Sequence, residues 1–200
     1  MWKNLWTGVL RLLIRAALSL RYRLMIKGLD QLTFSKKGGV LFLPNHPAEI
    51  DPVLLTLILW KRFQVHPLVV EPFYYLKGAH YFQKLVGAVP LPDLAGLINR
   101  WKEKRVEKCL KLIEEGLNNG KSYLIYPSGR LKVGPEEVVG GSSFVYNLIQ
   151  ESPEANIVLV RTTGLWGSRF SKALTGVTPT FGKVAWEGIK IALKNLFFFI

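Results

Sequence analysis

The chain has 200 residues, a length that suits a single domain with a substantial core. Its net charge of +13 and its 49% hydrophobic content indicate an anionic partner that also offers apolar surface, and its single cysteine excludes an internal disulfide. Basic residues lie among Leu, Ile and Trp, with no zinc-ligand spacing and no RNA-binding signature, so the composition favours anionic lipid over nucleic acid. We therefore expect a reducing compartment, no nucleic-acid partner, and a structural role for Cys109 in the core.

The first predicted element is a helix over residues 2–23. A narrow polar stripe recurs at every fourth position on an otherwise apolar surface: Lys3, Thr7, Arg11, Arg15 and Ser19. Arg11 and Arg15 interrupt every window that could span a bilayer, and they also break the apolar region that a cleaved signal needs. A helix in the membrane interface, with Trp2 and Trp6 at headgroup depth, fits this pattern. The alternative is a helix packed against the domain itself.

The rest of the chain alternates between predicted strands and helices. The predicted strands are 24–32 (with a turn), 40–43, 63–70 and 122–126, and the predicted helices are 53–60, 71–86, 97–117 and one that begins near Phe144. This order predicts one α/β domain, a mixed central sheet flanked by helices. We assign residues 1–25 to the amphipathic membrane-interface helix and 26–200 to the α/β core.

Polar residues follow the predicted strand 40–43 in tight order. They are Asn45, His46, Glu49 and Asp51. A neutral imidazole can accept a proton at cellular pH, and a carboxylate at its other ring nitrogen fixes the tautomer and stabilises the imidazolium. His46 and Asp51 are five residues apart, a separation that a turn and the first turn of a helix beginning at Pro52 can close. The pattern predicts a general base, His46, oriented by Asp51.

A second polar segment, PSGRLKVG, follows the predicted strand 122–126. In open α/β sheets, ligands bind at the carboxyl ends of the strands, so this segment repeats the arrangement of the first. Gly129 lets the backbone approach an anion, and Arg130 can donate two parallel hydrogen bonds to phosphate oxygens. The alternative is a surface arginine in a turn.

The string NHPAEID at residues 45–51 resembles the first motif of the glycerolipid (lysophospholipid-type) acyltransferases, and YPSGRL at 126–131 resembles their arginine-bearing motif. The second is closest in form to the acyltransferase domain of the acylglycerophosphoethanolamine acyltransferases. The resemblance implies that His46 and Asp51 catalyse transfer of a fatty acyl group from acyl carrier protein or coenzyme A to a hydroxyl of a lysophospholipid or glycerol phosphate. It implies no metal and no cofactor. The expected substrate-binding residues are Asn45, Ser128, Gly129, Arg130 and Arg161.

Three positions depart from the family pattern. Asp93 stands where the second motif has an arginine, Ser128 where the third has a glutamate, and Leu159 where the fourth has a proline. The segment NIVLVRTTG at 156–164 resembles that fourth motif, and the resemblance implies a buried strand there. These departures favour the alternative of a non-catalytic lipid-binding domain with the same fold. The expected location is the cytoplasmic face of the cell's inner membrane, as a peripheral or monotopic protein.

The remaining predictions concern residues outside the two motifs. His66 and His80 are interpreted as structural. Trp166, Phe170, Arg169 and Lys172 are interpreted as a second amphipathic segment facing the membrane. The apolar tail, residues 189–200, is expected to insert in lipid or to belong to a longer apolar segment.

Overall fold

A computed structural model of the chain describes residues 22–93, 99–139 and 143–180, with isolated positions on either side of them. In chain order the elements are β1 (Val40–Pro44), α2 (Asp51–Phe63), β2 (His66–Val70), α3 (Glu71–Tyr74), α4 (Ala79–Leu85), β3 (Val89–Leu91), α5 (Arg100–Asn118), β4 (Tyr123–Leu124), α6 (Phe144–Glu151) and β5 (Asn156–Val160). Most of the helix expected at 2–23 and of the tail at 189–200 lies outside the described residues, so both stay predictions.

The strands form one five-stranded sheet in the order β3-β2-β4-β1-β5. Every described pairing is parallel, including Pro44 with Val160 and Val70 with Leu91, so the expected mixed sheet is wrong in this detail. Parallel neighbours need crossover connections, and the helices between successive strands supply them. A parallel sheet places the carboxyl ends of all its strands at one edge, and both polar segments therefore lie there.

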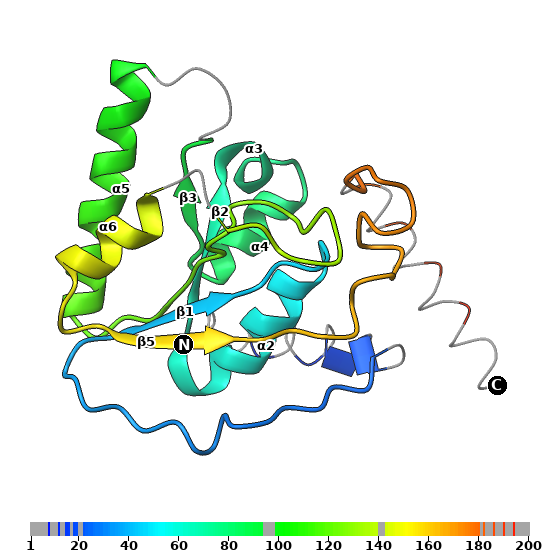
Figure 1. Cartoon of the computed structure of the whole chain (residues 1–200), viewed down its shortest axis with the longest axis horizontal. Helices are drawn as coiled ribbons and strands as arrows, with labels where there is room; N and C mark the ends of the chain where they lie inside the picture. The colour runs from blue at the N-terminus through cyan, green and yellow to red at the C-terminus, as the bar shows by residue number, and fades with distance from the viewer. Residues whose placement is uncertain are drawn as a thin grey trace.

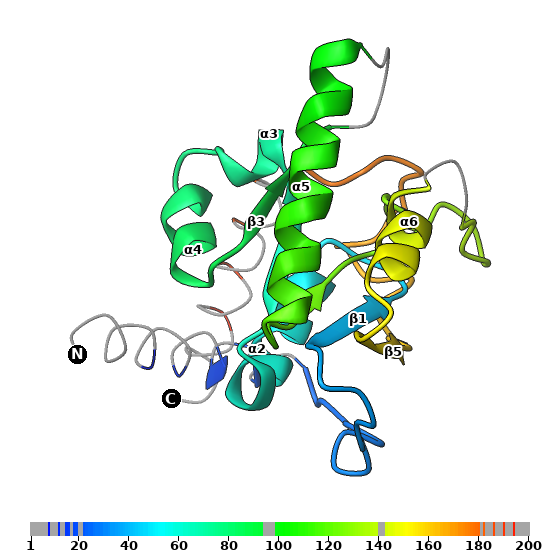
Figure 2. The same ribbon diagram turned by 90° about the vertical axis from the view of Figure 1, so that its left-hand side faces the viewer.

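Helices cover both faces of the sheet, as expected for an α/β domain (Figures 1 and 2). Leu41 and Leu43 of β1 pack in a core with α5 and α6, whereas Val40 and Phe42 point to the opposite face and pack against α2. All five residues of β1 are buried, which is typical of a parallel strand covered on both faces. Figure 2 looks onto the side formed by α5 and α6. Because β1 is packed against helices on both faces, it holds the start of the polar segment that follows it in place.

The Gly38–Gly39 pair is required by close packing at the start of β1. A Cβ atom at Gly38 would overlap the carbonyl oxygen of Glu154, and one at Gly39 would overlap that of Lys121. The amide of Gly39 donates to the carbonyl of Leu117 at 2.6 Å. Only glycine lets the chain pass between these two backbones and enter the centre of the sheet.

Some predicted elements differ from the observed ones. Residues 24–32 form no strand, because the carbonyls of Leu29 and Leu32 accept hydrogen bonds from the Arg62 guanidinium, at 2.7 and 3.1 Å, in place of a neighbouring strand. Leu29 and Leu32 still pack on the core beside α2. Trp101, expected on the buried face of its helix, is 65% exposed because it lies in the first turn of α5, near the edge of the sheet.

The segment after β5 is also more buried than expected. Phe170 packs with Ala48, Leu54 and Leu165 in a small core beneath the start of α2, so this side chain does not face lipid. Within the described part of the chain, no helix combines the length and the apolar character needed to cross a bilayer.

Candidate active site

The carboxyl end of β1 brings His46 and Asp51 together. Nδ1 of His46 lies 3.1 Å from Oδ1 and 3.2 Å from Oδ2 of Asp51. Asp51 is the first residue of α2 and is fully buried, whereas the His46 side chain keeps 14% of its surface exposed. The imidazole is therefore the outer member of the pair and the carboxylate the inner one. This is the geometry that the spacing of the two residues predicted.

The buried Asp51 carboxylate has two further hydrogen-bond donors. The hydroxyl of Tyr126 donates to Oδ1 at 2.7 Å, and the amide of Ala48 donates to Oδ2 at 3.3 Å. A buried carboxylate needs such bonds, because the loss of water around a charge is otherwise very costly. Burial, and then the charge of Asp51, raise the pKa of Tyr126 well above its ordinary value. Tyr126 therefore stays a neutral donor and Asp51 an acceptor.

Tyr126 also fixes the plane of the imidazole. Its ring stacks on His46 with centroids 4.0 Å apart and an angle of 27° between the planes. His46 is thus held at Nδ1 by Asp51 and over one face by Tyr126. Nε2 has no hydrogen-bond partner among the residues that the structure describes. That nitrogen is the one available to take a proton from a substrate.

Two contacts to the His46 main chain come from the loop after the arginine motif. The carbonyl of His46 accepts from the amide of Lys132 at 2.9 Å, and its own amide donates to the Glu137 carboxylate, with distances of 3.1 and 3.0 Å to the two oxygens. Sequence reasoning missed both Tyr126 and Glu137. A tyrosine at the end of a buried strand was a usable signal for the first, but no local pattern marks Glu137.

Replacing Tyr126 by phenylalanine should lower turnover by about tenfold with little change in KM. The change keeps the ring over His46 but removes the donor to Asp51, and a hydrogen bond to a charged group contributes about 1.5–3 kcal/mol. Steady-state kinetics of the variant tests this. Tyr146→Phe, an exposed tyrosine on α6, is the matched control and should behave like the wild type. Unchanged turnover in Tyr126→Phe would leave Tyr126 with a packing role only.

Glu49 adds a third ionisable group beside the pair. Its burial raises the pKa of its carboxyl, the charges of His46 and Lys172 lower it, and that of Asp51 raises it. Its amide donates to the carbonyl of Phe170 at 2.9 Å, so the segment after β5 holds the loop between β1 and α2. Two separate loops therefore hold the main chain of the segment that carries His46.

Asn45 connects the ends of two neighbouring strands. Its side chain accepts from the amide of Thr162 at 2.6 Å and donates to the carbonyl of Thr162 at 2.9 Å. These two hydrogen bonds hold the end of β1 against the segment after β5. The contact of Asn45 with substrate stays a prediction. Arg161, the residue before Thr162, is exposed at the same edge of the sheet.

The arginine motif forms a tight turn after β4. The amide of Gly129 donates to the carbonyl of Tyr126 at 3.0 Å, and Gly129 has a φ of +62°, a conformation that favours glycine. Ser128 is buried, and its hydroxyl donates to the carbonyl of Arg130 at 2.9 Å. The Arg130 side chain is exposed, and Lys132 two residues later contacts the His46 main chain. The turn therefore places Arg130 at the same edge as His46.

The other histidines and the cysteine have structural surroundings, as expected. Nδ1 of His66 lies 2.9 Å from the carbonyl of Gly87, and Nδ1 of His80 lies 3.1 Å from that of Tyr74. Cys109 is buried in the core, and its burial raises the thiol pKa to about 11. Among the described residues, no three His, Cys, Asp or Glu side chains gather as metal ligands.

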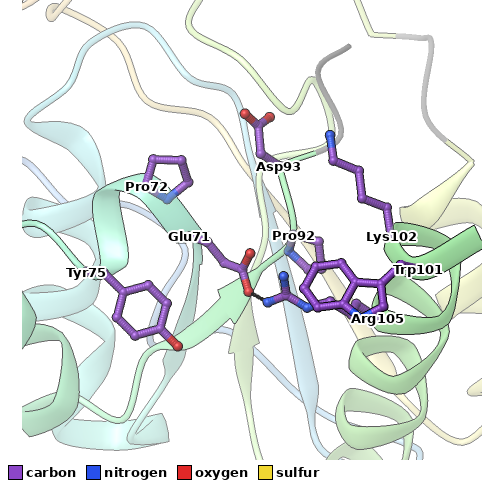
Figure 3. Close-up of a pocket in the computed structure, with 8 residues that line it drawn as sticks. All are labelled: Glu71, Pro72, Tyr75, Pro92, Asp93, Trp101, Lys102 and Arg105. Atoms are coloured by element: carbon purple, nitrogen blue, oxygen red, sulfur yellow. Dashed lines mark ion pairs between the residues drawn. The ribbon is translucent and has the colours of Figure 1, made fainter. Parts of the chain in front are cut away.

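A cavity of about 350 Å³ opens at the ends of β2 and β3. It is lined by Glu71, Pro72, Tyr75, Pro92, Asp93, Trp101, Lys102 and Arg105. In Figure 3, Tyr75 and Trp101 stand on opposite sides, with an ion pair between Glu71 and Arg105 between them. The Arg105 guanidinium also lies 4.6 Å from the centre of the Trp101 ring. The cavity and His46 share one edge of the sheet, since all the strands are parallel.

Two comparisons with known proteins identify the family of the chain and a similar fold. A model of the acyltransferase family matches residues 25–158, about two thirds of the chain. The fold is similar to that of the 1-acyl-sn-glycerophosphate (LPA) acyltransferase PlsC from Thermotoga maritima, with a TM-score of 0.53 and 9% sequence identity over 90% of this chain and 73% of that one. The chain therefore belongs to the acyltransferase family.

Proposed function

We propose that this acyltransferase moves a fatty acyl group from a thioester of acyl carrier protein or coenzyme A to a free hydroxyl of a lysophospholipid or glycerol phosphate. The observation that carries the proposal is the contact between His46 and the buried Asp51 at the carboxyl edge of the sheet. Family membership supports the reaction class, and the acceptor of the PlsC structural relative supports a glycerolipid acceptor.

In the proposed step, Nε2 of His46 removes the proton of the acceptor hydroxyl while Asp51 stabilises the resulting imidazolium. The oxygen attacks the thioester carbonyl, and the tetrahedral intermediate collapses with loss of the thiolate, which receives the proton from His46. An ester and a free thiol result, and no covalent acyl-enzyme forms. General-base action typically supplies about 10² to 10⁴ in rate, and alignment of the two substrates supplies much of the rest.

Two exposed arginines are the phosphate-binding residues of this proposal. Arg130 follows β4 and Arg161 follows β5, so they lie on either side of the β1 end that carries His46. We propose that Arg130 binds the phosphate of the acceptor and that Arg161 contacts phosphates of the donor. A guanidinium can bind a phosphate with two hydrogen bonds, each stronger than a neutral one.

We also propose that the protein works at the cytoplasmic face of the inner membrane. Leu24, Met25 and Ile26 are exposed in succession, with Met25 at 80%, directly after the segment expected to lie in the interface. Such a run of exposed apolar side chains is typical of a surface that contacts lipid. The net charge of +13 favours a surface rich in anionic lipids.

An acyl-transfer assay with purified protein tests this function. Labelled acyl-coenzyme A and acyl carrier protein thioesters should each be offered with glycerol phosphate and a panel of lysophospholipids, and labelled product should form with at least one pair. Binding to anionic vesicles without any product would support the lipid-binding alternative. Absence of both would contradict the proposal and that alternative together.

The cavity at the ends of β2 and β3 leads to a prediction about the acceptor. Its lining carries two carboxylates, Glu71 and Asp93, and two cations, Lys102 and Arg105, so it has no excess of positive charge for a phosphate dianion. Asp93→Arg should therefore raise kcat/KM for lysophosphatidic acid or glycerol phosphate relative to zwitterionic lysophospholipids, by about tenfold for a reversal of one nearby charge. Glu103→Arg, an exposed charge reversal on α5 outside the cavity lining, is the control. Equal ratios in both variants would show that the cavity does not contact the acceptor.

A further inference from the structure

Beyond Asn45 the β1–β5 pairing no longer supports the main chain. The last bond of the pairing joins the amide of Asn45 to the carbonyl of Val160 at 3.3 Å, and Pro47 has no amide to donate. His46 lies between these two positions, and in the described structure both of its main-chain groups bond to the loop 131–139 (Figure 1). The orientation of the imidazole therefore depends on that loop as well as on Asp51 and Tyr126.

Glu137 is the charged member of this contact. Its two carboxylate oxygens lie 3.1 and 3.0 Å from the His46 amide nitrogen. Glu137 is also close enough to contribute to the raised pKa of Tyr126, after the larger effects of burial and of Asp51. A bond from an amide to a carboxylate is stronger than one to a neutral acceptor. Glu137 therefore contacts the same unit, His46 with Tyr126 and Asp51, that holds the base.

The outer part of the loop has little other support. Leu131 is buried at its start, and Lys132 lies 5.1 Å from the centre of the Trp166 ring. Val133, Val138 and Val139 are each at least 60% exposed, so apolar packing does not fix the distal half of the loop. In the described structure, the hydrogen bond that the His46 amide donates to Glu137 is thus what holds the distal half of the loop against the site.

The arginine motif itself brings no carboxylate to the site, because Ser128 precedes Gly129 and Arg130. The Ser128 hydroxyl is buried and donates to the carbonyl of Arg130, so it makes no contact with His46. A carboxylate nonetheless reaches the first motif, from Glu137, nine residues further along the chain. The loop supplies an acidic group that the motif itself lacks.

We infer that Glu137 is a positioning residue: by holding the His46 main chain it keeps the imidazole stacked on Tyr126, with Nε2 directed to the substrate. This inference rests on the proposed general-base function of His46. Within the loop 131–139, Glu137 is then the residue whose side chain holds the base.

Kinetics of Glu137→Ala and Glu137→Gln provide the first test. Glu137→Ala should lower kcat by about ten- to a hundredfold, with KM for both substrates and the melting temperature nearly unchanged, because a misaligned base affects the chemical step and not binding. Glu137→Gln keeps a neutral acceptor and should fall between this variant and the wild type. Glu136→Ala, an exposed glutamate next in the chain, is the matched control and should keep wild-type kcat.

Nuclear magnetic resonance of the imidazole provides a second test that needs no turnover. The chain has three histidines, so the Cε1–H signal of His46 can be assigned by its loss in His46→Gln. The stacked Tyr126 ring should shift this signal upfield, and Glu137→Ala should remove part of that shift. The signals of His66 and His80 should stay in place.

The outcomes separate this inference from the proposed function. A moved His46 signal in Glu137→Ala, in a protein that acylates no acceptor, would support the positioning role and contradict the enzymatic one. A signal that stays in place would overturn the positioning role, whether or not kcat falls. Wild-type kcat in Glu137→Ala would overturn it too.

Discussion

His46→Ala should lower the turnover of acyl transfer by about 10² to 10⁴ while KM for the phosphorylated acceptor changes little. Among the described residues at this edge of the sheet, the His46 imidazole is the group that is both partly exposed and bound to a buried carboxylate through its other nitrogen. Removing it deletes the proton acceptor but leaves Arg130 in place. Single-turnover measurements with labelled thioester, at saturating acceptor, measure the chemical step directly.

His80→Ala is the matched control for this variant. His80 is half-buried, and its Nδ1 contacts the carbonyl of Tyr74, away from the motif residues. Its loss should leave turnover within about twofold of the wild type, since its ring contacts Tyr74 and Tyr75 and not the His46–Asp51 pair. Turnover of His46→Ala within a few fold of this control would refute a general-base role for His46. Vesicle binding should be equal in both variants, because neither change touches the segments expected to contact lipid.

The part of the site that lies within one motif was predictable from the sequence. His46 and Asp51 are separated by a turn and the first residue of a helix, so local geometry alone brings them into contact. The short apolar run behind a Gly-Gly pair predicted β1 as a buried strand, and all five of its residues are buried. Periodicity located the approximate extent of α5, whereas β5 was expected from the resemblance of its segment to the fourth motif.

The remaining contacts of the site join segments far apart in the chain. Tyr126 bonds to Asp51 across 75 residues, and Glu137 bonds to His46 across 91. No periodicity or spacing encodes such pairs, because they depend on which strand lies beside β1. The sheet order β3-β2-β4-β1-β5, with β4 next to β1, creates both contacts, and a single sequence does not specify that order.

The errors in the predicted elements have a similar origin. The amphipathic period of α5 placed Trp101 on the buried face, but the sheet does not extend to cover the first turn of that helix. Phe170 lies in a segment of aromatic and basic residues, a composition typical of segments that contact lipid. Its side chain nevertheless packs in a small core with Ala48 and Leu54. In both cases the tertiary partners, and not the sequence pattern, decided the burial.

Asp51→Asn should lower turnover by about 10³ to 10⁴ with a nearly unchanged fold. The amide keeps the shape of the carboxylate and can still accept from Tyr126, but it cannot stabilise an imidazolium and can bind the wrong tautomer of His46; in the serine-protease triad the same exchange costs about 10⁴. Asp30→Asn, an exposed carboxylate outside the site, is the control and should keep wild-type turnover.

Asp51→Ala distinguishes this catalytic role from a structural one. It leaves the Tyr126 hydroxyl and the Ala48 amide without their acceptor in a buried site, and each unsatisfied group costs about 1–3 kcal/mol. Chemical denaturation should therefore show a lower free energy of unfolding for Asp51→Ala than for Asp51→Asn, although both have lost turnover. If Asp51→Asn instead keeps turnover within tenfold of the wild type, the charge of Asp51 does not assist His46, and the carboxylate serves only to anchor the start of α2.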